Sequence, residues 1–221
     1  MKTYLFHGQA GAGKDTQVEM ILKKYDVERI ATGEMMRKMK EEGDPYAVEV
    51  FKKVAQGIWP NPEETFTLFA QWIKRFDPKK DWILVSVARY VDQIPFLDKV
   101  LTDVGRKLDK VIHFTLTEGK ALERLAGRKI CSNCQGTFHP TFKPEKIEGI
   151  CDLCGGKLEV REDDKPESIK KRFEQYAVSI KPYVEEFNKR GILIEIDASP
   201  SIEEIHKEVL KHLEFSNERQ N

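Results

Sequence analysis

The chain of 221 residues has no long apolar run and no excess of charge of either sign. No stretch approaches the roughly 18 consecutive apolar residues of a membrane-spanning helix, and the N-terminus does not read as a signal peptide. Lysine plus arginine and aspartate plus glutamate number 37 each, so no bulk charge favours nucleic acid or an acidic membrane as partner. We therefore expect a cytoplasmic protein that binds neither nucleic acid nor a membrane. Any bound anion should be held by a local cluster of basic residues.

Cysteine is also scarce, and all four cysteines lie in two pairs. Cys131-x-x-Cys134 is followed after sixteen residues by Cys151-x-x-Cys154, a spacing typical of zinc sites. In a reducing compartment such thiols bind metal rather than form disulfides. Four thiolates complete a tetrahedral shell with no open position, which predicts a structural Zn²⁺. Reduced core cysteines, a redox pair, or His139 as a competing ligand are the alternatives.

The stretch from Gly8 to Thr16 reads Gly-Gln-Ala-Gly-Ala-Gly-Lys-Asp-Thr. A short apolar segment, residues 2–7, precedes it, and residues 17–22 show helical spacing. In a strand–loop–helix context, glycines let backbone N–H groups surround a phosphate, and Lys14 adds a full positive charge. The motif is that of a phosphate-binding loop except for Asp15, where Ser or Thr is usual. A plain glycine turn is the alternative; we predict a nucleotide-binding loop.

Beyond this loop, strand and helix patterns alternate along the chain. The sequence predicts strands at residues 27–30, 82–87, 111–116 and 192–196, and helices at residues 32–39, 45–56, 62–76, 92–107, 117–126, after 164 and after 200. Pro182 is expected to kink or end the penultimate helix, and Ser199-Pro200 to cap the last one. Such alternation is typical of an α/β protein with a parallel sheet covered on both faces.

Six arginines stand out by position, because they flank the cysteine segment or lie in separate segments that a fold can bring together. They are Arg37, Arg89, Arg124, Arg128, Arg161 and Arg172. Phosphoryl transfer needs positive charge around the β- and γ-phosphates, and planar guanidinium groups bind several phosphate oxygens at once. Taken one at a time, each arginine is also compatible with a solvated surface.

With these motifs in view, the chain resembles the adenylate kinase family over nearly its whole length. Residues 8–17 are similar to the family's phosphate loop, and residues 31–37 to its monophosphate-binding segment. Arg89 with Gln93 resembles its phosphate-binding arginine and base-reading glutamine. Residues 122–128 and 161–172 resemble the two ends of its lid, and the four cysteines resemble the zinc-binding lid of bacterial members.

The resemblance implies a P-loop nucleoside monophosphate kinase fold, with a five-stranded parallel sheet, helices on both faces and a small zinc-binding lid insert. It assigns residues 1–130 and 161–221 to the core, about 31–60 to a monophosphate-binding insert and 131–160 to the lid. It also implies the reaction ATP + AMP ⇌ 2 ADP with Mg²⁺. No obvious exposed apolar helix suggests an obligate oligomer, so we expect a monomer.

The resemblance also implies roles for individual residues. The residues that it places around the moving phosphoryl group are Lys14, Arg89, Arg124, Arg161 and Arg172. Those that it assigns to ATP are Gly11, Ala12, Gly13, Lys14, Asp15, Thr16, Arg124, Arg128, Thr137, Phe138 and Pro200. Those that it assigns to AMP are Thr32, Arg37, Gly57, Ile58, Trp59, Ser86, Arg89, Gln93, Arg161 and Arg172.

The chain departs from the family at the metal and acceptor sites. The family's Asp-Gly-Phe-Pro-Arg run is Val85-Ser86-Val87-Ala88-Arg89 here, and its glycine after the loop lysine is Asp15. Two other functions therefore remain open: a kinase for UMP or CMP, and a catalytically weak nucleotide-binding regulatory protein. We predict that Asp15 supplies the carboxylate that Val85 lacks; the alternative is that it caps the following helix.

Overall fold

A computed structural model describes residues 1–55, 60–134, 136–160, 164 and 166–218. The predictions made for Gly57, Ile58, Trp59 and Arg161 lie outside the described residues. Among the described residues, no helix combines the length and the apolar character needed to cross a membrane.

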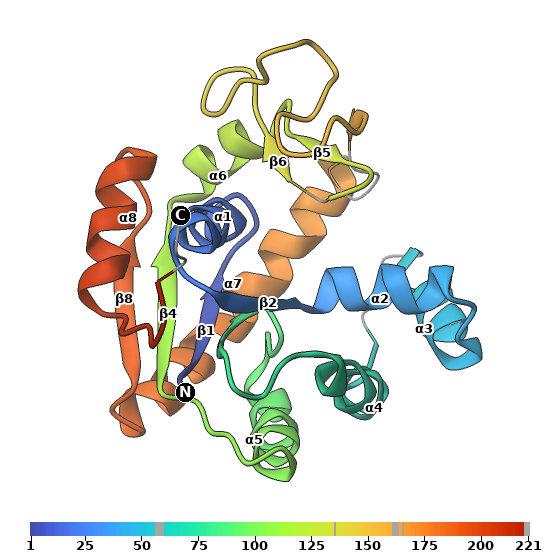
Figure 1. The fold of residues 1–221 in the computed structure, drawn as a ribbon, viewed down its shortest axis with the longest axis vertical. Coiled ribbons are helices and arrows are strands. Elements are labelled where there is room, and N and C mark those ends of the chain that lie inside the picture. The colour runs from blue at the N-terminus through green and yellow to red at the C-terminus, as the bar shows by residue number, and fades with distance from the viewer. Residues whose placement is uncertain (56–59, 135, 161–163, 165, 219–221) are drawn as a thin grey trace.

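The core is a five-stranded parallel sheet (Figure 1). Its strands, in spatial order, are β2 (Val27–Ala31), β3 (Asp81–Val85), β1 (Thr3–Gly8), β4 (Lys110–Thr115) and β8 (Leu193–Asp197). Strands buried on both faces need continuous apolar runs, and β3 is buried along its whole length. The sheet confirms the fold class and gathers the carboxyl ends of β1, β3 and β4 at one edge.

Helices cover both faces of the sheet. On one face, α1 (Lys14–Lys24) and α8 (Ile202–Lys211) contribute Val18, Ile21, Ile205 and Val209 to an apolar cluster with the strands. The other face is covered by α4 (Pro62–Trp72), α5 (Ile94–Asp103) and α7 (Pro166–Lys189). Two further helices, α2 (Thr32–Glu41) and α3 (Pro45–Ala55), project to one side, as Figure 1 shows.

Helix ends follow local capping chemistry, with one correction. Asn61 caps α4 as predicted: its side chain accepts a hydrogen bond from the Glu64 N–H, and the Glu64 carboxylate accepts one from Asn61. The prediction that Ser199-Pro200 caps the last helix is wrong. Ser201 is the cap of α8, because its hydroxyl accepts from the Glu204 N–H and Glu204 bonds back to Ser201.

The alternative in which Pro182 ends its helix is also wrong, since α7 continues to Lys189. A proline inside a helix removes one backbone hydrogen bond. Tyr183, directly after the proline, and Phe187, one turn later, are fully buried in the core, so packing holds the helix past this position. The helix consequently runs from beside the lid along the sheet (Figure 1).

The cysteine segment forms a separate antiparallel sheet of three short strands. These are β6 (Thr137–Phe138), β5 (Lys129–Cys131) and β7 (Leu158–Val160). Its apolar centre consists of Cys131, Phe138, Cys151 and Leu158. So small a cluster provides little burial, which fits a segment that a metal must stabilise. The helix α6 (Glu118–Leu125) connects β4 to this lid segment.

Candidate functional site

A cavity of about 660 Å³ opens at the carboxyl ends of β1 and β3, between the core and the lid segment. It collects most of the residues predicted for the site. The predicted residues that line it are Gly11, Gly13, Lys14, Asp15, Thr16, Ser86, Arg89, Arg124, Arg128, Thr137, Phe138, Arg172 and Pro200. Those not among the lining residues are Ala12, Thr32, Arg37 and Gln93.

The glycine loop has the backbone that phosphate binding requires. Gly11 adopts φ +83°, and a Cβ there would lie 2.7 Å from the Ala121 carbonyl oxygen. A Cβ on Gly8 would lie 2.6 Å from the Phe114 carbonyl oxygen. Neither position can hold a side chain without displacing backbone. Gly13 caps α1 without a side-chain hydrogen bond, so the first N–H groups of this helix remain available to an anion.

Lys14 folds back over this loop. Its Nζ donates to the carbonyl oxygens of Gly8 at 2.7 Å and Gln9 at 2.8 Å. Burial lowers the pKa of Lys14 to about 7; the charge of Asp15 opposes this shift, and nearby arginines, including Arg89, add to it. A phosphate at this position would favour the ammonium form.

An acidic residue of the segment that resembles one end of the family's lid, for which no role was predicted, holds two of the arginines. Asp164, with 1% of its side chain exposed, accepts from Arg128 Nε at 2.8 Å and Nη2 at 2.6 Å. It also accepts from Arg172 Nη2 at 2.8 Å. Burial lowers the pKa of Arg124, whose guanidinium lies 5.8 Å from the centre of the Phe142 ring. Arginines from separate segments thus converge on one cavity, an arrangement suited to phosphoryl groups.

Asp15 does not cap α1, so that alternative is wrong. Its Oδ1 lies 2.6 Å from Arg29 Nη2, and Arg29 Nη1 lies 2.5 Å from Glu34 Oε2. Burial raises the pKa of Asp15, but attraction and hydrogen bonding to Arg29 outweigh it and lower that pKa to about 2. The carboxylate is therefore ionised at neutral pH and faces the cavity next to Lys14.

The segment after β3 carries backbone strain. Ser86 has φ +53°, the one non-glycine residue with positive φ in the described chain. The Thr32 hydroxyl donates to its carbonyl oxygen at 3.1 Å. Farther on, Gln93 is buried and its Oε1 accepts the Arg89 N–H at 2.7 Å. That oxygen is already bonded, so base reading by Gln93 stays a prediction.

Contacts from α1 hold the lid segment over the core. Glu19 Oε1 accepts from the Thr137 N–H at 3.1 Å, and Glu19 also pairs with Lys143. His139 Nε2 lies 2.8 Å from the Ala126 carbonyl oxygen and outside the cysteine cluster, so it is not a competing metal ligand. No local pattern marks Glu19, because its partners lie more than 100 residues away.

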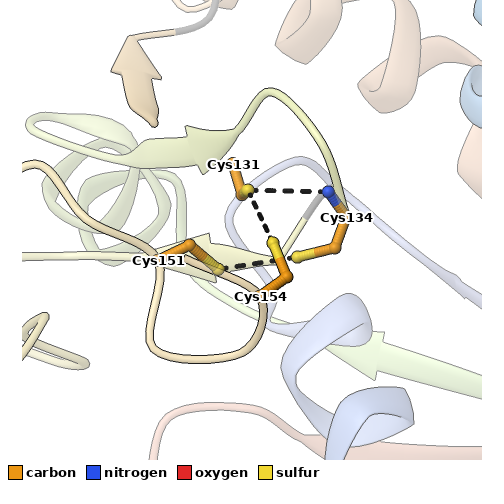
Figure 2. Close-up of side chains that lie close together, drawn as sticks. All are labelled: Cys131, Cys134, Cys151 and Cys154. Carbon is orange, nitrogen blue, oxygen red and sulfur yellow. Dashed lines mark hydrogen bonds between the residues drawn. The ribbon is translucent and has the colours of Figure 1, made fainter. Parts of the chain in front are cut away.

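The four cysteines form one cluster (Figure 2), as predicted. Their Sγ atoms lie within 4.8 Å of one another, and two of the Sγ–Sγ distances are 3.5 Å. Sulfurs about 2.3 Å from a tetrahedral zinc would be about 3.8 Å apart, so the geometry fits such an ion. A Cβ on Gly156 would lie 2.9 Å from Cys131 Sγ, so only glycine fits beside the cluster without displacing a ligand. The four sulfurs therefore have the donor type and spacing of a thiolate metal site.

The parallel sheet, the phosphate loop and the converging arginines define a P-loop α/β phosphotransferase whose lid carries four clustered thiols. The family profile described as adenylate kinase matches residues 6–192. Similar proteins include the adenylate kinases of Caldicellulosiruptor saccharolyticus (35% identical over 206 residues, 93% of this chain and 96% of the relative) and Staphylococcus epidermidis (36% over 207 residues, 94% and 96%). The chain belongs to the adenylate kinase family and transfers the γ-phosphoryl group of ATP to AMP, giving two ADP.

Proposed function

We propose that the cavity holds both nucleotides, with the phosphates of ATP on the glycine loop and Lys14. The observation that carries this proposal is the convergence of Lys14, Arg89, Arg124, Arg128 and Arg172 on one cavity. The guanidinium groups would neutralise the charge that spreads over the transferred phosphoryl group. Thr137, Phe138 and the backbone at Pro200 would contact the ATP base at the other end of the cavity.

For the acceptor, we propose that Arg89 binds the phosphate of AMP at the carboxyl end of β3. Arg89 lines the cavity from the segment after β3, whereas α8 packs beside β8 at the far edge of the sheet, which favours a second phosphate site at β3. Thr32 and Arg37 on α2, with Gln93 and Ser86, would complete it. Residues 31–60 would then act as the monophosphate-binding insert, residues 131–160 as the lid, and residues 1–130 and 161–221 as the core.

We further propose that Asp15 orients the water shell of Mg²⁺. Among the described residues that line the cavity, two are acidic, Asp15 and Glu203. Glu203 lies on α8, whereas Asp15 follows the loop lysine. Magnesium requires hard oxygen ligands or their bound waters, and the buried Val85 offers none. The hydroxyl of Thr16 would serve the same ion.

In the lid, we propose that the bound metal is Zn²⁺ and that its role is structural. Four thiolates close the shell, so no position remains for substrate. Because such a site needs reduced thiols, it favours the cytoplasmic location that we propose.

The test is the binding of each nucleotide to matched arginine variants. Arg89→Ala should weaken AMP binding at least about tenfold, the loss expected for one charge-assisted contact, while ATP binding changes little. Arg190→Ala is the control, because Arg190 pairs with Asp98 and Glu186 on the surface, outside the cavity lining and the proposed insert. Equal losses for both nucleotides, or none, would reject the assignment. Calorimetric titration with ATP and AMP separately gives the result.

A further inference from the structure

Two histidines lie buried beside the phosphate loop, where the reaction assigns them no role. His7 on β1 and His113 on β4 face each other in register on neighbouring strands. Both are almost fully buried, at 3% and 2% exposed, and their Nδ1 atoms lie 3.0 Å apart. His7 immediately precedes Gly8 and lines the same cavity as the loop.

The short Nδ1–Nδ1 distance limits how the protons can be arranged. A hydrogen bond between two ring nitrogens requires one of them to donate and the other to accept. The Tyr176 hydroxyl lies 3.3 Å from His113 Nε2, and the backbone of Gln9 hydrogen-bonds to Tyr176. We assign the arrangement in which the Gln9 N–H donates to Tyr176, the Tyr176 hydroxyl donates to His113 Nε2, and His113 Nδ1–H donates to His7 Nδ1. The loop backbone therefore connects through Tyr176 to a neutral histidine pair.

The surroundings can also hold a charged pair. The ring of Tyr183 stacks on His7 with 3.9 Å between centroids and 21° between planes. An aromatic face at this distance stabilises an imidazolium ion by a cation–π interaction. A third proton would enter at His113 Nε2 and convert Tyr176 from donor to acceptor. The neutral and the charged pair thus use the same partners.

Charged and titratable groups on several elements face the pair. The charged ones are Lys14 on α1, Arg89 after β3 and Glu195 on β8, which pairs with His113 in register; the neutral phenols are Tyr176 and Tyr183 on α7. Burial lowers the pKa of His7 well below its usual range, and His113, Lys14 and Arg89 add to this effect. Burial, then Lys14, lowers the pKa of His113 to about 4. Without nucleotide, burial first and the neighbouring cations second therefore keep the pair neutral.

We propose that His7 and His113 together take up one proton when a polyphosphate fills the loop, and so add a positive charge to the phosphate site. The bound phosphates place several negative charges against Lys14 and Arg89, which reverses the local potential. A nearby opposite charge raises the pKa of a histidine. The proton comes from solvent and binds at His113 Nε2, and the Nδ1 proton already shared between the rings can then pass to His7, which stacks on Tyr183. The added proton leaves when the nucleotide dissociates. The proposal rests on the phosphate-binding role of the loop.

This linkage has a definite sign. A group whose pKa is higher in the complex than in the free protein strengthens binding at low pH, and its contribution is lost as pH rises through the pKa of the complex. Lys14 also gains a proton on phosphate binding, and its pKa in the free protein is about 7. The number of protons taken up on binding therefore does not distinguish the histidine pair from Lys14. Spectra of the imidazole rings do distinguish them, because they report the histidines alone.

The experiment records long-range ¹H–¹⁵N spectra of histidine-labelled full-length protein between pH 5 and 8, with and without the β,γ-methylene analogue of ATP and magnesium. His7→Gln and His113→Gln assign the signals. In the free protein both rings should show neutral tautomers throughout. In the complex, the titration of the pair should move upward by about 1 to 3 pH units and give an imidazolium signature. His212, which does not line the cavity, is the internal control.

Binding of the analogue is followed in the same samples by calorimetry. If the analogue binds and both rings stay neutral at every pH, the inference is overturned while the proposed phosphate site stands. If the analogue does not bind, the proposed function fails and the inference with it. A titration that moves for His212 as much as for the pair would also overturn it, because a general salt or pH effect would then explain the shift.

Discussion

Asp15 Oδ1 lies 2.6 Å from Arg29 Nη2, and this ion pair joins the residue after the loop lysine to β2, the edge strand that carries Arg29. Arg29 also contacts Glu34 at 2.5 Å, so the same guanidinium reaches the first turn of α2. One arginine thus links the proposed ATP-phosphate site to the proposed monophosphate insert. Because side-chain exposure of all three residues lies between 20% and 34%, the pairs are screened only in part.

Removing the Asp15 carboxylate should raise the magnesium requirement of the enzyme. We expect Asp15→Gly to need about tenfold more Mg²⁺ for half-maximal turnover, because no other acid lines that end of the cavity among the described residues. The double change Asp15→Gly with Val85→Asp should recover the wild-type requirement. The measurement is turnover against magnesium concentration, with circular dichroism to check folding. An Asp15→Gly enzyme that is equally active at low magnesium would contradict a metal role.

The affinity for ATP should fall with rising pH above about 7. The pKa of Lys14 is about 7 without nucleotide, and phosphate raises it in the complex. Below pH 7 the lysine is charged in both states, whereas above it the free protein must gain a proton to bind. Affinity should then fall by up to about tenfold per pH unit. Calorimetry at pH 6 to 9 measures it, and Lys14→Met should bind weakly with no such slope between pH 7.5 and 9.

Replacing Ser86 by glycine should stabilise the protein. Ser86 holds φ +53°, which glycine adopts without steric cost. The contact with Thr32 uses the Ser86 carbonyl oxygen, so it survives the change. We expect the free energy of unfolding to rise by about 1 kcal/mol. Denaturant unfolding measures it, with Ser199→Gly as a control that should destabilise. A loss of stability in Ser86→Gly would show that its side chain outweighs the strain.

The lid should depend on its metal. We expect about one zinc per chain in protein purified without a histidine tag, and Cys151→Ser should loosen the lid while the parallel sheet stays folded. The measurement compares amide hydrogen-exchange rates in the lid, residues 129–160, with those in the sheet strand of residues 110–115. Ser132→Ala, a neighbouring lid change outside the four thiolates, should leave the lid protected. A metal-free protein with an equally protected lid would count against a structural ion.

The features that could be predicted from the sequence are the ones encoded locally. The strand–glycine loop–helix segment, the Asn61 capping box and the paired cysteines each depend on residues close together in the chain, and the structure has all three. Propagation of α7 past Pro182 could not be predicted this way, because it depends on the burial of Tyr183 and Phe187 against distant strands.

The contacts that complete the site could not be predicted from the sequence for a different reason. Asp164 bridges Arg128 and Arg172, and the first of these pairs spans 36 residues of sequence. Arg29 was not singled out at all, although it holds Asp15. In a chain that is 33% charged, local spacing does not say which acid meets which base. The histidine pair likewise follows from strand register, which only the assembled sheet defines.

The most direct test of the account is a coupled assay of the purified enzyme with ATP and each of AMP, UMP, CMP and GMP. We predict turnover with AMP at a kcat/KM at least about a hundredfold above the others, because a site that pairs with one base leaves buried polar groups unmatched by the wrong one. Arg89→Ala should then lose most of this activity, while the Arg190→Ala control keeps it. Equal turnover of all four acceptors, or none with AMP, would contradict the account.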